Sequence, residues 1–222
     1  MRFRYLPDGR MFVPARGNPP KAPEGYTVDP SNPFMFRPHS KVTNEEATFQ
    51  ELYQHLYEDP MLNYGQAEMR RCPGVRFFPE YKDYLEGKIF DFGSGTGDTV
   101  QMLRREGYYA IGMDQVNLGN GMAVGNICEP QTIVGFQTAI CIDVFEHIYD
   151  EELLVLMDNM LQCPKQIISV HTGPGRERGC KIDLHINKKT FAEWKVFLET
   201  KFIVKEFRQL GKQRGLFFCY TR

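Results

Sequence analysis

Two acids and three glycines lie in the segment with the clearest potential for chemistry. Asp91 closes an apolar run, and Gly93, Gly95 and Gly97 follow it at every second position. A helical pattern comes next, and a second short apolar run then ends at Asp114. Glycines let backbone approach a ligand closely, the amides at a helix start attract a carboxylate or phosphate, and an acid at a strand end can accept hydrogen bonds from both ribose hydroxyls. This order predicts a site for a nucleoside-bearing cofactor at the carboxyl ends of parallel strands.

The spacing of the glycines distinguishes between classes of nucleoside cofactor. A dinucleotide site requires G-x-G-x-x-G with the third glycine inside the helix, but this chain reads D-x-G-x-G-x-G and has Asp98 at that position. An acid there is poorly placed to face a pyrophosphate. The run resembles motif I of the class I S-adenosylmethionine-dependent methyltransferases, with Asp114 at the place of the ribose-binding acid. The resemblance implies S-adenosylmethionine as cofactor, bound by Asp91, Gly93, Ser94, Gly95, Gly97, Asp114 and Gln115. The alternative is a tight strand-to-helix turn that binds no ligand.

A second cofactor contact is implied after the third predicted strand, at Asn126 and Ile127. Many members of the family have an acid followed by an apolar residue here, which contact the amino group and the ring of adenine. Asn126 departs from the acid, although its side-chain oxygen can still accept a hydrogen bond. The alternative is a turn that simply ends the strand.

The run 138–147, Thr-Ala-Ile-Cys-Ile-Asp-Val-Phe-Glu-His, combines an apolar strand with titratable groups at its end. It resembles the fourth-strand motif of methyltransferases that act on small-molecule hydroxyls or nitrogens, which implies that Asp143 and Val144 contact the cofactor. Glu146 and His147 are then candidate catalytic residues near the methyl group. A histidine that titrates near neutral pH suits removal of a proton from the acceptor. His185, just before a predicted helix, is a second candidate base.

A metal-assisted alternative comes from two branches of the same family, the ubiquinone-pathway O-methyltransferases and the terminal-ribose small-RNA methyltransferases. Both carry Glu-x-x-Glu-His at this place and bind a divalent metal with it. The equivalent set here is Asp143, Glu146, His147 and His185, which suits Mn, Zn or Fe better than Mg. Asp replaces the first Glu, and metal-free relatives also carry Asp-x-x-Glu-His, so the site is predicted without a metal and the metal remains the alternative.

From residue 88 onward, strand and helix patterns alternate as in a doubly wound sheet. We expect an α/β fold with a mostly parallel seven-stranded sheet of the methyltransferase type and an antiparallel last strand, because the turn 210–213 joins the last two strands. The expected strands are 88–92, 108–113, about 122–125, 138–142, 166–170, 202–209 and 214–220. The expected helices are 97–106, about 150–161 and 188–200.

Two further regions precede this predicted methyltransferase domain of residues 88–222. Residues 1–42 form a proline- and aromatic-rich arm, in which prolines disfavour long helices and central strands and a small hairpin is expected around Pro7-Asp8-Gly9. Residues 43–87 form a helical lead-in or lid that starts at a capping box, Thr43-Asn-Glu-Glu46. A short helix is expected from Pro79 to Leu85, and Tyr57, Tyr64 and Phe78 are lid candidates by the resemblance.

Composition fits one soluble, cytoplasmic chain. The 27 basic residues nearly balance the 28 acidic ones, which gives no overall attraction to nucleic acid. The apolar runs are too short to span a membrane, and the six cysteines contain no C-x-x-C pair.

These observations predict an S-adenosylmethionine-dependent methyltransferase that acts on a hydroxyl or amine of a small-molecule substrate. One alternative is methylation of RNA or another macromolecule, recognised through the arm and through Arg176 and Arg178. Another is a non-catalytic assembly module that forms an oligomer through its N-terminal arm.

Overall fold

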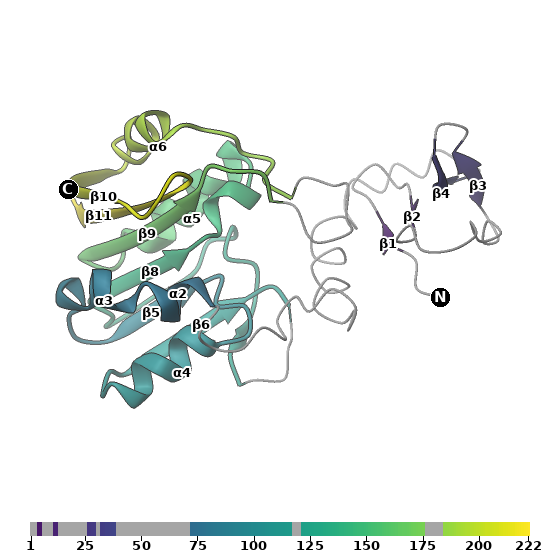
Figure 1. Cartoon of the computed structure of the whole chain (residues 1–222). Coiled ribbons are helices and arrows are strands. Elements are labelled where there is room, and N and C mark those ends of the chain that lie inside the picture. The colour runs from purple at the N-terminus through teal and green to yellow at the C-terminus, as the bar shows by residue number, and fades with distance from the viewer. Residues whose placement is uncertain are drawn as a thin grey trace. The chain divides into compact units, whose positions relative to one another are not determined.

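The computed structural model describes residues 72–116, 121–175 and 184–222, together with four short strands near the N-terminus. Contacts divide the chain into two compact units, Met1–Gln66 with Arg176–Ile182, and Ala67–Gly175 with Asp183–Arg222. The larger unit contains the sheet and the candidate site, and Figure 1 shows its layered arrangement of helices around a central sheet. In the described residues, no helix is long and apolar enough to cross a membrane.

The central sheet has seven strands in the order β10-β11-β9-β8-β5-β6-β7. Only β11 runs against its neighbours β9 and β10, and the other pairings are parallel. The strands are β5 (Ile89–Phe92), β6 (Ala110–Asp114), β7 (Ala123–Val124), β8 (Thr138–Ile142), β9 (Lys165–His171), β10 (Phe202–Gln209) and β11 (Arg214–Thr221). This confirms the predicted mostly parallel sheet with a reversed last strand.

The order of the strands reverses between β5 and β8. From β5 the chain proceeds outward to β6 and β7, and it then crosses back to β8 on the other side of β5. The connections that follow β5 and β8 lead in opposite directions along the sheet, so the carboxyl ends of these two strands form its switch point. Ligands of open α/β sheets bind at such a switch point.

Helices cover both faces of the sheet, because successive strand residues point to opposite faces (Figure 1). One core contains α4 and the helical segment before β5, with Ile89, Ile140 and Ile167 from the strands. The other core contains α5 and α6 against Phe92 and Cys141. The helices are α2 (Pro73–Arg76), α3 (Phe78–Tyr81), η2 (Lys82–Tyr84), α4 (Asp98–Arg105), η3 (Phe145–His147), α5 (Asp150–Met160) and α6 (Phe191–Leu198).

The start of α6 shows how a cap corrects a boundary predicted from periodicity alone. The expected helix 188–200 begins at Phe191, because Thr190 is its N-cap. The Glu193 amide donates to Thr190 Oγ1 at 3.3 Å, and the Thr190 amide donates to Glu193 Oε2 at 2.8 Å. This reciprocal capping box satisfies amides that the first helical turn leaves without partners.

The N-terminal strands form a separate four-stranded antiparallel sheet in the order β1-β2-β4-β3. Its strands are β1 (Arg4–Tyr5), β2 (Met11–Phe12), β3 (Tyr26–Asp29) and β4 (Asn32–Pro38). The hairpin expected around Pro7-Asp8-Gly9 is confirmed by the pairing of β1 with β2.

The expectation that prolines exclude central strands from the arm is wrong, because β4 lies between β2 and β3. Only Met35 and Phe36 pair with β2, whereas Pro33 and Pro38 lie outside that stretch. The prolines therefore flank the part of β4 that is hydrogen-bonded toward β2, where a missing amide would cost a ladder bond.

The lead-in is described only from residue 72 onward. The helix expected after Thr43, with Tyr57 and Tyr64, lies outside the described residues. The short helix expected at 79–85 is present as α3 and η2. Phe78 is half-buried and packs edge-on against Tyr81, at 5.7 Å between ring centroids.

Gly93 lies in the glycine turn and Gly107 lies after α4, so the two offer a matched test of backbone packing at the turn. Both have positive φ, but a Cβ at Gly93 would lie 2.6 Å from Val144 Cγ2, whereas a Cβ at Gly107 would have nothing within 4 Å. We expect Gly107→Ala to cost about 1 kcal/mol of unfolding free energy from φ strain, and Gly93→Ala to cost about 1–3 kcal/mol more from overpacking. Urea denaturation measures the unfolding free energy of both variants. Equal losses of unfolding free energy would contradict the close approach of Val144 to Gly93.

Candidate active site

The glycine turn after β5 is fastened to the end of β6 by backbone hydrogen bonds. The amides of Gly93 and Ser94 both donate to the Met113 carbonyl, at 2.9 and 3.0 Å. The Gly95 amide donates to Asp114 Oδ2 at 2.8 Å, and the Val116 amide donates to Asp114 Oδ1 at 3.1 Å. The turn and the acid that the sequence pairs by motif are thus in direct contact.

The two acids of the motif occupy different environments. Burial, followed by repulsion from Asp114, raises the pKa of the Asp91 carboxyl well above its ordinary value. Burial also raises the pKa of Asp114, but hydrogen bonds from backbone amides oppose this. Negative charge at the end of the two strands is therefore favoured on Asp114, where a carboxylate can accept from a ligand.

Ser94 is a buried polar residue of this turn whose hydroxyl has no hydrogen-bond partner among the described residues. A buried hydroxyl without a partner costs free energy, so an unsatisfied one at a strand end calls for a partner such as a ligand or water. A nucleoside-bearing ligand with polar groups fits this turn.

Val144 and Gln115 lie at the edges of the turn. Val144 packs against Gly93, as its short distance to the position of a Gly93 Cβ shows. Gln115 follows Asp114 and its amide contributes to the environment of the Asp114 carboxylate. Both residues are half-buried, and their predicted contacts with a cofactor stay predictions.

Asn126 and Ile127 have roles in the local structure of the chain. The Cys128 amide donates to Asn126 Oδ1 at 2.9 Å, which closes a side-chain turn. Ile127 is buried in the core, and its carbonyl accepts from Asn159 Nδ2 at 2.9 Å. The turn beyond β7 corresponds to the alternative considered for this segment, and an adenine contact stays a prediction.

Asp143 follows β8 with φ = +55°, in the left-handed region. Its carboxylate accepts from Arg214 Nη2 at 2.5 Å, from Arg214 Nε at 3.1 Å and from Ser169 Oγ at 2.6 Å. The Arg214 guanidinium also lies over the Phe77 ring, 5.0 Å from its centroid. An unfavourable backbone conformation at a strand end is typical of functional sites, and here the ion pair holds it.

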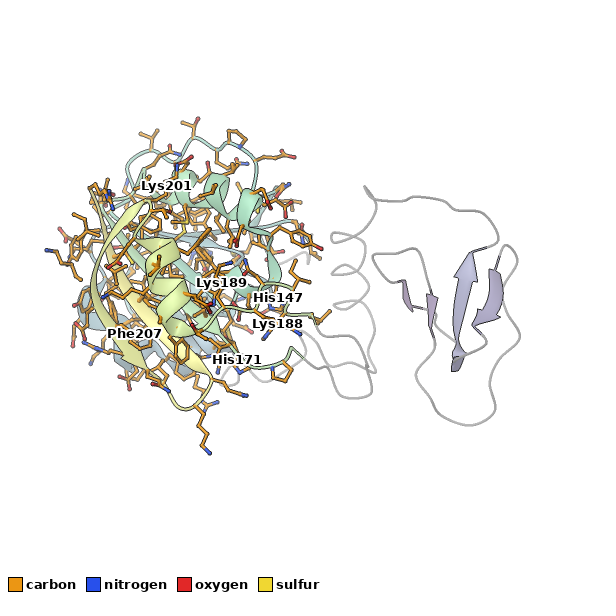
Figure 2. All side chains as sticks on the ribbon, turned by 90° about the horizontal axis from the view of Figure 1, so that it is seen from above. His147, His171, Lys188, Lys189, Lys201 and Phe207 are labelled. Carbon is orange, nitrogen blue, oxygen red and sulfur yellow. The ribbon has the colours of Figure 1, made fainter. Side chains whose placement is uncertain are left out.

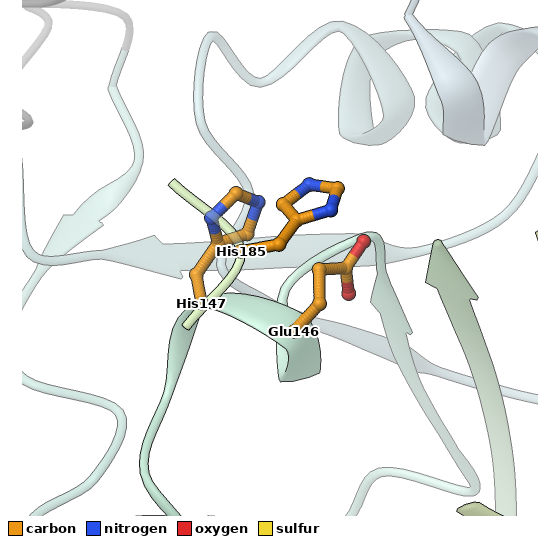
Figure 3. Close-up of side chains that lie close together, drawn as sticks. All are labelled: Glu146, His147 and His185. Atoms are coloured by element: carbon orange, nitrogen blue, oxygen red, sulfur yellow. The ribbon is translucent and has the colours of Figure 1, made fainter. Parts of the chain in front are cut away.

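Glu146, His147 and His185 form a compact cluster next to Asp143. Each offers one ligand atom, and these atoms lie within 4.8 Å of one another. Figure 3 shows the Glu146 carboxylate and the two imidazoles gathered from η3 and from the segment before α6. The structure thus brings together all three residues predicted to be catalytic.

The two imidazoles are oriented by backbone carbonyls. His147 Nδ1 donates to the Leu184 carbonyl at 3.0 Å, and His185 Nδ1 donates to the Gly173 carbonyl. A carbonyl oxygen only accepts, so each Nδ1 carries the proton and each Nε2 carries the lone pair. Burial, with the proximity of His185, lowers the pKa of His147 to about 4, so its ring is neutral at pH 7.

Glu146 is fully buried. Its Oε1 accepts from the His171 amide at 2.9 Å, whereas its Oε2 has no hydrogen-bond partner within the described part of the chain. Burial, followed by repulsion from Asp143, raises the pKa of this carboxyl well above its ordinary value. A proton or a cation is therefore required for this carboxylate to be stable in its place.

His171 and Arg214 join the site although no sequence motif singles them out. The ring centroid of His185 lies 5.1 Å from that of His171 and 4.7 Å from that of His147. Figure 2 labels His147 and His171. His171 ends β9 and faces Arg214 of β11 in the register of the sheet. Its place at the end of a predicted strand was the one signal available from the sequence.

Comparisons with known proteins agree with this architecture. No protein-family model and no curated protein sequence matches the chain. Among solved structures, Burkholderia thailandensis 1,6-didemethyltoxoflavin-N1-methyltransferase, with 1,6-didemethyltoxoflavin and S-adenosylhomocysteine bound, is similar over 100% of this chain and 99% of that chain, with TM-score 0.63 and 12% identity.

Two other similar solved structures also have methyltransferase names. A TehB-like S-adenosylmethionine-dependent methyltransferase from Corynebacterium glutamicum matches 77% of this chain and 98% of its own, with TM-score 0.57 and 12% identity. Human N-acetylserotonin methyltransferase in complex with S-adenosylmethionine matches 77% of this chain and 59% of its own, with TM-score 0.58 and 15% identity. The chain therefore has the fold of the class I S-adenosylmethionine-dependent methyltransferases.

Arg176 and Arg178, considered for recognition of an anionic or macromolecular substrate, lie outside the described residues.

The buried Glu146 carboxyl predicts a pH-dependent stability. Its folded-state pKa exceeds the ordinary value of 4.5, so as pH rises above 4.5 the unfolded chain ionises first and the folded state loses relative stability. In metal-free protein we expect Glu146→Gln to raise Tm relative to wild type at pH 8 and to lose that advantage toward pH 4.5. The exposed Glu151→Gln is the control. Calorimetric melts that show the same Tm difference at both pH values would refute this prediction.

Proposed function

We propose that the protein binds S-adenosylmethionine at the glycine turn after β5 and transfers its methyl group to a hydroxyl or amine of a small-molecule acceptor. The observation that carries this proposal is the contact between the turn and Asp114, through the Gly95 amide at 2.8 Å. This contact supports the proposal because the turn after β5 and Asp114 at the end of β6 meet at the same edge, beside the switch point of the sheet.

On the cofactor side, Asp114 would accept from the ribose hydroxyls. Each carboxylate oxygen has two acceptor positions, so its bonds with the Gly95 and Val116 amides leave capacity for a ligand. Gly93, Gly95 and Gly97 would let the backbone lie close to the methionine part, and the buried Ser94 hydroxyl would find its partner there. Asp91, Gln115, Asn126, Ile127, Asp143 and Val144 remain proposed lesser contributors.

On the acceptor side, the cluster of Glu146, His147 and His185 would face the methyl group. Methyl transfer from a sulfonium requires alignment of the nucleophile and, for a hydroxyl or protonated amine, loss of a proton. His147, with its pKa of about 4, is a weak base at neutral pH. Burial, followed by repulsion from Arg214, lowers the pKa of His171 as well, and the side chains of His147 and His171 are both half-buried.

A divalent metal fits the same cluster, because the buried Glu146 Oε2 has no hydrogen-bond partner in the residues that the structure describes and two imidazoles lie beside it. Glu146, His147 and His185 would hold the ion. When bound, it would lower the pKa of an acceptor hydroxyl, which would favour the nucleophilic form at neutral pH.

A small molecule is favoured over RNA or a protein as the acceptor. The 1,6-didemethyltoxoflavin-N1-methyltransferase that is similar along the entire chain was solved with 1,6-didemethyltoxoflavin bound. The composition, with 27 basic and 28 acidic residues, offers no overall attraction to a polyanion.

The ribose role of Asp114 is tested by calorimetric titration with S-adenosylmethionine. We expect Asp114→Asn to weaken binding about 10- to 100-fold, the effect of losing charge-assisted hydrogen bonds of about 1.5–3 kcal/mol. Asn keeps one acceptor oxygen, so the turn retains part of its support.

Asp158→Asn is the matched control, because Asp158 pairs with Lys201 on the exposed side of α5. Cofactor affinity equal in the two variants would exclude the ribose role. Tight binding of a nicotinamide dinucleotide by wild type would favour the dinucleotide class instead.

A further inference from the structure

We propose that the ion pair between Asp143 and Arg214 sets the metal preference of the neighbouring cluster, by keeping Asp143 out of the ligand set. The cluster then offers one carboxylate and two imidazoles, which favours a transition-metal ion such as Co²⁺ or Zn²⁺ over Mg²⁺. The inference rests on the proposed acceptor-side role of Glu146, His147 and His185. It assigns to Arg214 the part of a positioning residue.

The cluster has the features of a site built to receive a cation. Its three candidate ligand atoms lie within 4.8 Å of one another. The carbonyls of Leu184 and Gly173 accept from the Nδ1 atoms of the two imidazoles, so the lone pairs reside on Nε2. Backbone partners of this kind orient metal-binding histidines and increase their basicity.

Glu146 supplies the independent sign of a missing partner. The His171 amide fixes its Oε1 at 2.9 Å, and the Oε2 atom is buried with no hydrogen-bond partner among the described residues. In Figure 3 the carboxylate points toward the His185 ring. A cation at this point would satisfy the oxygen and compensate the buried charge.

Asp143 is close to the cluster in sequence and in space, yet both of its carboxylate oxygens are engaged. Arg214 donates to Oδ2 at 2.5 Å and to Oδ1 at 3.1 Å, and Ser169 Oγ donates to Oδ1 at 2.6 Å. The side chains of Asp143 and Arg214 are only 12% and 22% exposed. To coordinate a metal, Asp143 would have to leave a largely buried guanidinium unpaired, which is strongly unfavourable.

Arg214 is itself fixed by its surroundings. It lies at the start of β11, where the sheet register places it opposite His171. Its guanidinium lies over the Phe77 ring, 5.0 Å from the ring centroid. The reversed direction of β11 brings this positive charge to the carboxyl ends of the parallel strands.

The charges of Asp143, Arg214 and Glu146 then determine which divalent ion the cluster binds more tightly. With Asp143 neutralised by Arg214, a divalent ion would be balanced by Glu146 alone and would retain a net positive charge. Mg²⁺ requires oxygen ligands and binds through carboxylates and water, whereas imidazole suits Zn²⁺ and similar ions. Removing the arginine would return a second carboxylate to the site and favour hard ions.

Metal titrations of the chelator-treated full chain, without cofactor or acceptor, test this inference. Co²⁺ is the first probe, because its visible d–d absorption reports nitrogen and oxygen ligation directly. We expect one Co²⁺ per wild-type chain and no displacement by a large excess of Mg²⁺. Glu146→Gln should lower Co²⁺ affinity about 100-fold, whereas Asp143→Asn, which removes no ligand but leaves the Arg214 charge without its carboxylate, should lower it less than about tenfold.

The role of Arg214 is tested by Arg214→Met, with Arg208→Met as the matched control. Arg208 also pairs with a carboxylate, that of Glu206, and stacks on an aromatic ring, that of Phe218, but outside the cluster. Titration with Mn²⁺, followed by electron paramagnetic resonance, should show affinity at least about tenfold higher in Arg214→Met than in the control. Circular dichroism melts establish that each variant is folded.

Three results would overturn the inference. They are no Co²⁺ bound by wild type, equal losses of Co²⁺ affinity in Asp143→Asn and Glu146→Gln, or equal Mn²⁺ affinity in the two arginine variants. If Arg214→Met does not fold, the comparison of Asp143→Asn with Glu146→Gln decides. None of these measurements involves S-adenosylmethionine, so their failure is distinguishable from failure of the proposed cofactor binding.

Discussion

The hydrogen bond between the Gly95 amide and Asp114 connects the two segments from which the candidate cofactor site is made. It can form because β5 and β6 are adjacent and parallel, so the turn after one strand and the acid at the end of the other meet at the same edge. The path of the short turn and the closeness of the buried Asp91 to the half-buried Asp114 depend on this geometry. A dinucleotide-type turn would need a glycine where Asp98 begins α4.

The same edge concentrates groups that are costly to bury. Asp91, Glu146 and the Ser94 hydroxyl are buried there, and the raised pKa values of the two acids report the penalty for their charged forms. Two dry cores, one on each face of the sheet, provide the stability that offsets this cost. Such an arrangement is typical of functional sites, where stability is exchanged for chemistry.

Much of the fold follows from patterns in the sequence. Apolar runs with acids or glycines at their ends predict the strands, and the turn 210–213 predicts the reversed β11, because a short connection joins only antiparallel neighbours. The start of α6 was predicted too early, since periodicity does not reveal that Thr190 and Glu193 cap each other. The central position of β4 was missed because composition does not show which of its residues pair on both sides.

The candidate site was predictable where a motif is local, as for Gly93 to Asp114 or Glu146-His147. His171 and Arg214 were not predictable, because their roles arise from the register of two strands about 40 residues apart in sequence. Nor does a motif show that Asp143 is already paired with Arg214. Distant pairing thus decides which of the local candidates are available to a ligand.

The central claim is that the turn after β5 receives S-adenosylmethionine, and a crystal structure with S-adenosylhomocysteine tests it most directly. The account predicts the ribose hydroxyls on Asp114 and the homocysteine part along the backbone of Gly93 to Gly97. A crevice that stays empty at saturating ligand, or a ligand bound elsewhere on the chain, would contradict it.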